Sequence, residues 1–241
     1  MNVFRFSALL TLLLSAPLHA DSKKEPKDSK EAESFKKQLG CEKLPQGNVS
    51  ERMKLANCYY KMDADTKAIE VLREVTRKNP QQLDAYFLSS WLLWRMGMRS
   101  GGEVEEAKSL EALGELEKAR LSNPTSWVVD REVGDFYFLR LNKAPKARVE
   151  YMKARENYDG DFSHGVPKAS RGEKAAIEDR IGRVSEILEI KGEALEASCR
   201  SLFFDPDNSV AEARIKRLGN CLRKGVKNPN KDEKTEKKKA G

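Results

Sequence analysis

The sequence predicts an all-α fold, an α-solenoid of about four stacked helix pairs that ends in a C-terminal capping helix. One spacing pattern occurs four times: an alanine is followed by a patterned residue four positions later and by another seven positions later. Three of the copies end in a proline at the same distance from the alanine. A helix pair of this kind cannot bury both of its faces alone, so the pairs must stack on one another.

The first twenty residues, MNVFRFSALLTLLLSAPLHA, have the features of a secretory signal peptide. Arg5 precedes an apolar run from Ala8 to Leu14, and the segment ends at Ala20. The run is shorter than the roughly 20 apolar residues that a membrane-spanning helix needs. We therefore expect residues 1–20 to be cleaved and the mature chain to be exported without a transmembrane segment. A bacterial periplasm is the expected compartment, and secretion is the alternative.

The excess of positive charge lies at the two ends of the mature chain. Residues 21–37 form a charged segment that we expect to be a flexible linker, and residues 223–241 form a basic tail that we expect to be disordered. The body between them, residues 38–222, holds equal numbers of basic and acidic residues. A nucleic-acid-binding surface needs positive charge clustered on a folded face, so this balance argues against nucleic acid as a partner. The tail is a candidate for weak contact with an anionic surface.

Four helix pairs are expected at about 49–82, 83–126, 127–170 and 175–208, and the pattern marks the second helix of each. Offsets of four and seven residues place the patterned side chains on one helical face. Proline ends a helix because it lacks the amide hydrogen and clashes with the preceding turn. The copies are Ala68, Leu72, Val75 and Pro80; Ala112, Leu116, Ala119 and Pro124; Ala147, Tyr151 and Ala154; and Ala194, Ser198, Ser201 and Pro206.

Two of the units are longer than the others. The second carries about ten extra residues around MRSGGEVEEA, and the third has one extra residue before Ala147 and a long loop after its second helix. A further helix at 209–222 is half polar, as a cap over the last apolar face of a stacked array should be. Its apolar stripe consists of Ala211, Ile215, Leu218 and Leu222.

The stretch from Val49 to Pro80 resembles a tetratricopeptide repeat (TPR). The segment ALEASCRSLFFDPDN, residues 194–208, resembles the second helix of that family and its closing Asp-Pro-Asp-Asn, and the resemblance extends over residues 49–208. It implies a non-enzymatic scaffold or adaptor in which the first helices line a concave groove that holds a peptide or an extended segment of a partner protein. The residues of the first unit at the family's spacing are Leu55, Ala56, Tyr59, Ala68, Leu72, Val75 and Pro80.

The family's groove positions, transferred to this sequence, give aromatic anchors beside arginine and asparagine. Such a set suits a peptide, because rings supply buried area and polar groups bond to a backbone or a carboxylate. Asn57 and Lys61 suggest capture of a carboxylate terminus, although the family's clamp of two lysines and two asparagines is not reproduced. Trp91 and Trp94 lie in a segment that is apolar on nearly all sides, so they either face the groove or pack in the core. The groove set is Met53, Asn57, Tyr60, Lys61, Phe87, Trp91, Trp94, Arg95, Arg131, Asp135, Phe138, Asp179, Arg180 and Arg183.

The chain has four cysteines, an even number in an exported protein, so disulfide bonds are expected. Cys199 lies on a helical stripe that should face the capping helix, which carries Cys221. Cys41 lies just before the first unit, and Cys58 lies in the first helix of that unit. We therefore predict that Cys41 pairs with Cys58 and Cys199 with Cys221, with free thiols as the alternative.

The mature chain offers little for catalysis. His164 is its single histidine, which excludes a histidine-based triad and a multi-histidine metal site. The loop that begins with Asp159, Asp161 and Ser163 starts like a calcium-binding loop, but it has His164 and Ser170 where that motif needs glycine and glutamate. We predict no catalytic residues, no metal and no cofactor.

The favoured function is therefore an exported, non-enzymatic scaffold or adaptor that binds a protein or peptide, with assembly of the cell envelope as its setting. The alternative is an envelope structural component that docks on anionic lipid or polymer through the basic tail. If the source is eukaryotic, Asn48 in Asn-Val-Ser is an acceptor for glycosylation.

Overall fold

Nine α-helices and one π-helical turn make up the described part of the chain in a computed structural model. The structure describes residues 40–41, 44–45, 47–159 and 168–221. The chain divides into the units Met1–Gly40 and Cys41–Gly241, and all of these helices belong to the second unit. The predicted signal peptide, linker and basic tail lie outside the described residues, as do Asp161, Ser163, His164 and Leu222.

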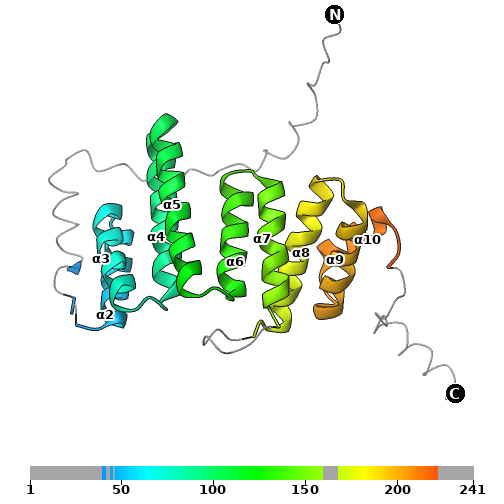
Figure 1. Cartoon of the computed structure of the whole chain (residues 1–241), viewed down its shortest axis with the longest axis horizontal. Coiled ribbons are helices and arrows are strands. Elements are labelled where there is room, and N and C mark those ends of the chain that lie inside the picture. The colour runs from blue at the N-terminus through cyan, green and yellow to red at the C-terminus, as the bar shows by residue number, and fades with distance from the viewer. Residues whose placement is uncertain (1–39, 42–43, 46, 160–167, 222–241) are drawn as a thin grey trace, which may run out of the picture. The chain divides into compact units, whose positions relative to one another are not determined.

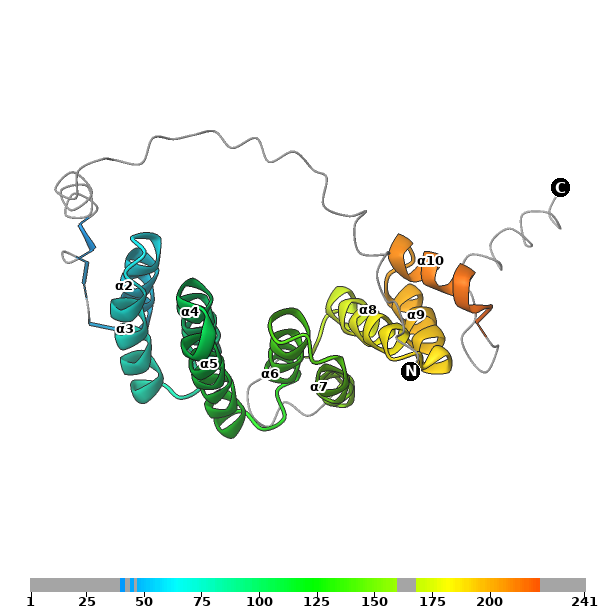
Figure 2. The same ribbon diagram turned by 90° about the horizontal axis from the view of Figure 1, so that it is seen from above.

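The helices follow one another as pairs in chain order, as both ribbon views show (Figure 1 and Figure 2). We call α2, α4, α6 with η2, and α8 the first helices, and α3, α5, α7 and α9 the second helices. Each second helix packs against its own first helix and against the first helix of the next pair. The fold is therefore an all-helical solenoid, as predicted. The elements are α2 (Val49–Lys61), α3 (Asp65–Lys78), α4 (Leu83–Ser100), α5 (Gly102–Ser122), α6 (Trp127–Asp135), η2 (Phe136–Arg140), α7 (Ala144–Asn157), α8 (Arg171–Ile187), α9 (Lys191–Phe204) and α10 (Ser209–Leu218).

The patterned residues of the second helices form the core of the stack. Every residue of the four copies apart from the prolines is at most 2% exposed. Alanine and serine at these positions let the neighbouring helices approach, while Leu72, Leu116 and Tyr151 fill the space between them. The periodicity of the sequence therefore identified the buried face of each second helix.

Two of the first helices begin with a capping box. Asn48 accepts a hydrogen bond from the backbone N–H of Glu51, and the Glu51 side chain accepts one from the backbone of Asn48. Ser170 and Glu173 repeat this arrangement at the start of α8. Because the box satisfies free amide groups of the first turn, α8 begins at Arg171, before the start near residue 175 that the sequence suggested.

The extra residues of the second unit lengthen both of its helices. The helices α4 and α5 have 18 and 21 residues, and they extend beyond the neighbouring pairs at one end (Figure 1). The chain reverses at Gly101 and Gly102, whose φ angles of 70° and 56° lie in the left-handed region that glycine tolerates. The insertion is thus a helical extension with a tight glycine turn.

The extra residue of the third unit is absorbed by the π-helical turn η2. The N–H of Leu141 donates to the carbonyl of Phe136, five residues earlier, at 3.2 Å. A π-helical turn accommodates one residue more than an α-helical turn, so α7 still presents its patterned face to the core. The third unit therefore keeps the packing of the others despite its extra residue.

At Gly134, the backbone of α6 lies directly against the ring of Tyr151 on α7. A methyl group added there would lie 2.5 Å from Cε1 of Tyr151, a ring that is fully buried. We expect Gly134→Ala to lower the free energy of unfolding by about 1–3 kcal/mol, the usual cost of overpacking a core. Gly114→Ala on α5 is the matched control, because nothing lies within 4 Å of its added methyl group. Urea unfolding would contradict the expectation if Gly134→Ala were as stable as Gly114→Ala.

A buried arginine and a disulfide hold the capping helix α10. Arg214 is 2% exposed, and its Nη1 atom lies 2.9 Å from Oδ1 of Asp179 and 3.2 Å from Oγ of Ser198. The absence of a side chain at Gly182 leaves room for it, since an added Cβ would lie 2.7 Å from Nη1. Cys199, which follows Ser198 in the sequence, is bonded to Cys221.

The second disulfide joins Cys41 to Cys58 at the other end of the stack. Both predicted pairings are therefore present, and the prediction of disulfide bonds in place of free thiols is confirmed for these residues.

Candidate functional site

Arginine side chains stack on aromatic rings at each junction between neighbouring first helices. At the first junction, the ring of Tyr60 on α2 meets the ring of Trp91 on α4 edge-on, with centroids 5.2 Å apart. The guanidinium carbon of Arg95 lies 4.7 Å from the Tyr60 ring centroid and 4.6 Å from the Trp91 ring centroid. Three of the groove residues predicted for units one and two are thus in direct contact.

Two further stacks continue this arrangement. At the second junction, the guanidinium of Arg140 on η2 lies 4.1 Å from the ring centroid of Trp94 on α4. At the third, the guanidinium of Arg183 on α8 lies 5.1 Å from the ring centroid of Phe138 on η2. We call the surface formed by Tyr60, Trp91, Arg95, Trp94, Arg140, Phe138 and Arg183 the first-helix face.

Arg140 was not among the predicted groove residues. It ends η2, and its position is set by the extra residue of the third unit, so the regular spacing of the repeat does not indicate it. Two features of the sequence could have indicated Arg140: the extra residue of the third unit, and the position of an arginine at the end of a first helix.

A carboxylate holds the arginine of the first stack in place. Nε of Arg95 lies 3.1 Å from Oδ2 of Asp65, which is 5% exposed at the start of α3. Arg99 donates to the same carboxylate at 3.3 Å and to Asp63 at 2.9 Å. Arg95 therefore joins α3 to α4, a positioning role that the repeat pattern did not predict.

Asp135 and Arg180 form a further link between units. Nε and Nη2 of Arg180 lie 2.6 Å and 3.1 Å from the two carboxylate oxygens of Asp135, and Tyr151 donates its hydroxyl to Oδ1 at 2.8 Å. Burial raises the pKa of Tyr151, and the neighbouring Asp135 carboxylate raises it further, so the hydroxyl remains a donor. Asp179 is held by Arg214 of the cap. These three predicted groove residues are thus engaged within the protein.

The remaining predicted groove residues differ in exposure. Met53 and Phe87 are partly buried against the core that includes α2 to α6, whereas Asn57 and Lys61 are exposed on α2. Arg131 donates to Glu132 at 2.6 Å. Trp91 and Trp94 are half-buried and pack against the same core as Met53. Each tryptophan thus combines core packing with partial exposure.

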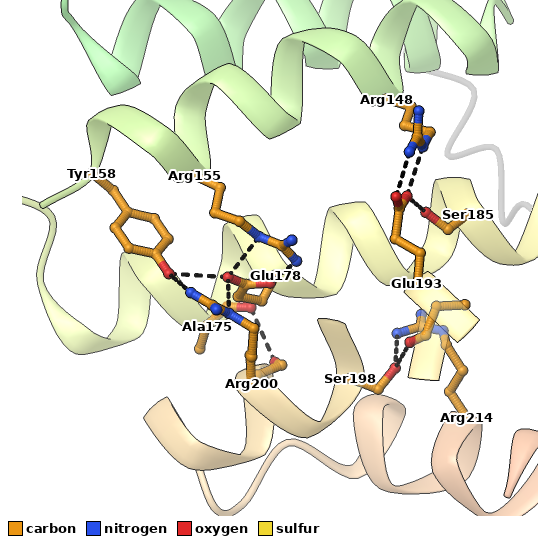
Figure 3. Close-up of polar contacts among 12 residues, drawn as sticks. Arg148, Arg155, Tyr158, Ala175, Glu178, Ser185, Glu193, Ser198, Arg200 and Arg214 are labelled. Atoms are coloured by element: carbon orange, nitrogen blue, oxygen red, sulfur yellow. Dashed lines mark hydrogen bonds and ion pairs between the residues drawn. The ribbon is translucent and has the colours of Figure 1, made fainter. Parts of the chain in front are cut away.

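A second set of ion pairs joins the third and fourth units (Figure 3). Glu178 is fully buried and accepts hydrogen bonds from Arg155 at 3.0 Å, from Arg200 at 2.9 Å and from the Tyr158 hydroxyl at 3.0 Å. Arg200 also donates to that hydroxyl at 2.7 Å. Glu178 on α8 therefore holds α7 and α9 together through four mutually bonded side chains.

Arg148 on α7 makes a comparable contact with Glu193 on α9 (Figure 3). Its Nε atom lies 2.6 Å from Oε1 of Glu193, and Ser185 donates to the same oxygen. The hydrogen bond from Arg148 is the main cause that holds the pKa of Glu193 below its usual value, and the hydrogen bond from Ser185 lowers this pKa further. A carboxylate held ionised and fully bonded has no free role as a general acid or base, so we assign this cluster to stability.

A cavity of about 480 Å³ lies between α3 and α5, on the side of the second helices. Glu115 in its wall is 2% exposed and binds Arg73 at 3.3 Å and Lys118 at 3.0 Å, so much of the charge in the wall is already paired. No pattern in the sequence indicated this cavity, because its walls come from two separate units.

The described residues contain no cluster of three or more histidine, cysteine, aspartate or glutamate side chains placed to hold a metal. Within the same residues, no helix combines the length and apolar character required to span a bilayer.

Comparison with known proteins supports the fold assignment. No family model and no curated protein matches the sequence. A thermophilic TPR protein of Thermus thermophilus is similar in structure, with a TM-score of 0.53 and 17% identity over 78% of this chain and 91% of that chain. PilW, a widely conserved type IV pilus biogenesis factor, has a TM-score of 0.47 and 18% identity over 71% of this chain and 70% of its own.

YrrB, described as a TPR protein with an unusual peptide-binding site, gives a TM-score of 0.35 and 16% identity over 77% of this chain and 99% of its own. Identities this low give no information on function, and of these three likenesses only that to the Thermus protein has a TM-score above 0.5. The likeness to the Thermus protein, together with the paired helices and the buried repeat pattern, identifies the chain as a solenoid with the TPR fold.

Proposed function

We propose that the chain is a non-enzymatic, exported scaffold or adaptor that binds a peptide or an extended segment of a partner protein on its first-helix face. The observation that carries the proposal is the row of aromatic–arginine stacks, one at each junction between neighbouring first helices. Half-buried rings beside arginines are the side chains that dominate binding energy at protein interfaces. A surface that continues from unit to unit suits an extended ligand.

The residues divide into two roles in this proposal. Trp91, Trp94, Phe138, Arg140 and Arg183 contact the ligand. Other side chains form ion pairs within the protein and keep the units in register. These are Arg95, Asp135, Asp179 and Arg180. Asn57 and Lys61 extend the surface onto α2, where both are exposed.

The proposed compartment is the bacterial periplasm, where the chain would act in assembly of the envelope. Two disulfides agree with an oxidising compartment, because such bonds form and persist in exported proteins. The leader-like segment at residues 1–20 supports the same assignment. The alternative of docking through the basic tail concerns residues outside the described part of the chain.

Peptide selection tests the proposed function. Peptides selected by display against the oxidised mature chain should slow hydrogen exchange in α4, η2 and α8. Trp94→Ala should weaken their binding at least about tenfold, as loss of an aromatic anchor does. Leu121→Ala is the matched control, because this side chain is 83% exposed on the second helix α5. Protection confined to the second helices, or equal effects of the two substitutions, would reject the proposal.

A further inference from the structure

On the basis of the proposed function, we propose that the segment bound on the first-helix face is acidic and that Arg140 and Arg183 bind its carboxylates. The proposal rests on a comparison of the three junctions. Each has an arginine stacked on an aromatic ring, but only at the first is that arginine neutralised by a buried carboxylate, Asp65, among the residues that the structure describes.

Arg140 and Arg183 differ from Arg95 in both exposure and pairing. Both side chains are exposed, whereas Arg95 is 15% exposed. Within the described part of the chain, they contact the rings of Trp94 and Phe138, and neither guanidinium has a carboxylate within ion-pair distance. The second and third junctions therefore each present an open positive charge.

Several charged side chains on the helices around these two arginines are paired, among them Asp179 and Glu186 on α8, which bind Arg214. Arg131 is paired with Glu132 at 2.6 Å, and Arg180 is paired with Asp135. The exposed acid of α4, Asp84, lies in the first turn of that helix, ten residues before Trp94 and hence about 15 Å along the axis. The part of the face around Trp94 and Phe138 consequently has an excess of positive charge, which is complementary to an acidic segment.

The stacking geometry suits carboxylate binding. A guanidinium that lies over a ring is held by cation–π attraction, and its N–H groups point outward in the guanidinium plane. A carboxylate can accept two of these N–H groups side by side, a contact that a neutral amide reproduces poorly. The ring also fixes the arginine rotamer, so less entropy is lost when the ligand binds.

The two arginines lie on neighbouring units, and this suggests a probe. Arg183 stacks on Phe138, which lies two residues before Arg140 in η2, so both guanidinium groups lie along one short stretch of the face. A peptide in the polyproline conformation rises about 3.1 Å per residue, so glutamates at every third position lie on one side about 9 Å apart. The probe is therefore a fluorescent, C-terminally amidated peptide of Pro, Ala and Glu with Glu at every third position. Its partner probe carries Gln at each of these positions.

Fluorescence anisotropy of the oxidised mature chain should show the Glu probe binding at least about tenfold more tightly than the Gln probe, and the difference should shrink with added salt. The double variant Arg140→Gln, Arg183→Gln should lose this difference. Both side chains are exposed, so the variant should unfold at the same urea concentration as the parent chain. Equal binding of the two probes, or binding of neither, overturns the proposal.

The charge-matched control is Arg77→Gln with Lys78→Gln, which removes two exposed charges from the last turn of the second helix α3. This variant should keep the preference for Glu. If it loses the preference, the acidic ligand binds beside the cavity between α3 and α5, and the assignment to Arg140 and Arg183 is wrong. A Gln probe with a free C-terminal carboxylate forms a further arm, and tight binding of this probe alone would assign carboxylate capture to Asn57 and Lys61, against the proposal.

Failure of this proposal is separate from failure of the proposed function. Selected peptides that protect the first helices but show no acidic preference would leave the binding face intact and reject its charge specificity. Selected peptides that protect only the second helices would reject both.

Discussion

Replacing Glu178 with alanine is expected to lower the free energy of unfolding by about 3–5 kcal/mol, the usual cost of removing one partner of a buried ion pair. The carboxylate is fully buried between α7, α8 and α9 and forms ion pairs with two guanidinium groups. Its loss would leave Arg155, which is 13% exposed, without its carboxylate partner. Arg200 is 39% exposed, so hydration would relieve part of its penalty.

Urea unfolding followed by far-UV circular dichroism would measure the change. Glu117→Ala on α5 is the matched control, because Glu117 also pairs with an arginine, Arg120, but is 49% exposed. An exposed pair contributes at most about 1 kcal/mol. Equal unfolding midpoints for the two variants would show that the Glu178 cluster contributes no more to stability than a surface ion pair.

Loss of the Cys199–Cys221 disulfide is expected to cost about 3 kcal/mol, because the bond closes a loop across a sequence separation of 22 residues. In the double variant Cys199→Ser, Cys221→Ser, we expect the amides of α10 to exchange faster than in the parent chain. Those of α2 and α3 should keep their rates, since each unit of a stacked array contacts mainly its neighbours.

The corresponding variant at the other end, Cys41→Ser with Cys58→Ser, is the reciprocal control. Its bond spans a separation of 17 residues, so the expected cost is again about 3 kcal/mol. Here α2 should exchange faster, and α10 should be unchanged. If either variant accelerated exchange evenly along the chain, the stack would unfold as one cooperative body and the prediction of local effects would be wrong.

The sequence was sufficient to predict the helix pairs, the buried faces of the second helices and both disulfides. The helix pairs and the buried faces depend on local spacing: Ala147, Tyr151 and Ala154 fall on one helical face whatever surrounds them. The pairing of Cys199 with Cys221, across 22 residues, was predicted instead from the helical stripe that carries Cys199 and should face the capping helix. The small residue Gly134 was also visible in the sequence, although the contact with Tyr151 that requires it was not.

Ion pairs between residues far apart in the sequence could not be predicted from local spacing. Asp65 and Arg95 are 30 residues apart, and Glu178 and Arg200 are 22 apart, so no local pattern links them. Charged residues on a helix usually mark its solvated side. Glu178, which is fully buried, breaks that rule because arginines of two other helices reach it.

The π-helical turn makes the third unit sensitive to insertion or deletion of a single codon. Removing one residue from η2 would restore α-helical spacing, and each later side chain of that turn would rotate by about 100° around the helix axis. Arg140 would then no longer reach Trp94, although both residues would still be present. A one-residue change of length in this turn is therefore a short route by which related chains could acquire or lose the ligand recognition proposed for this face.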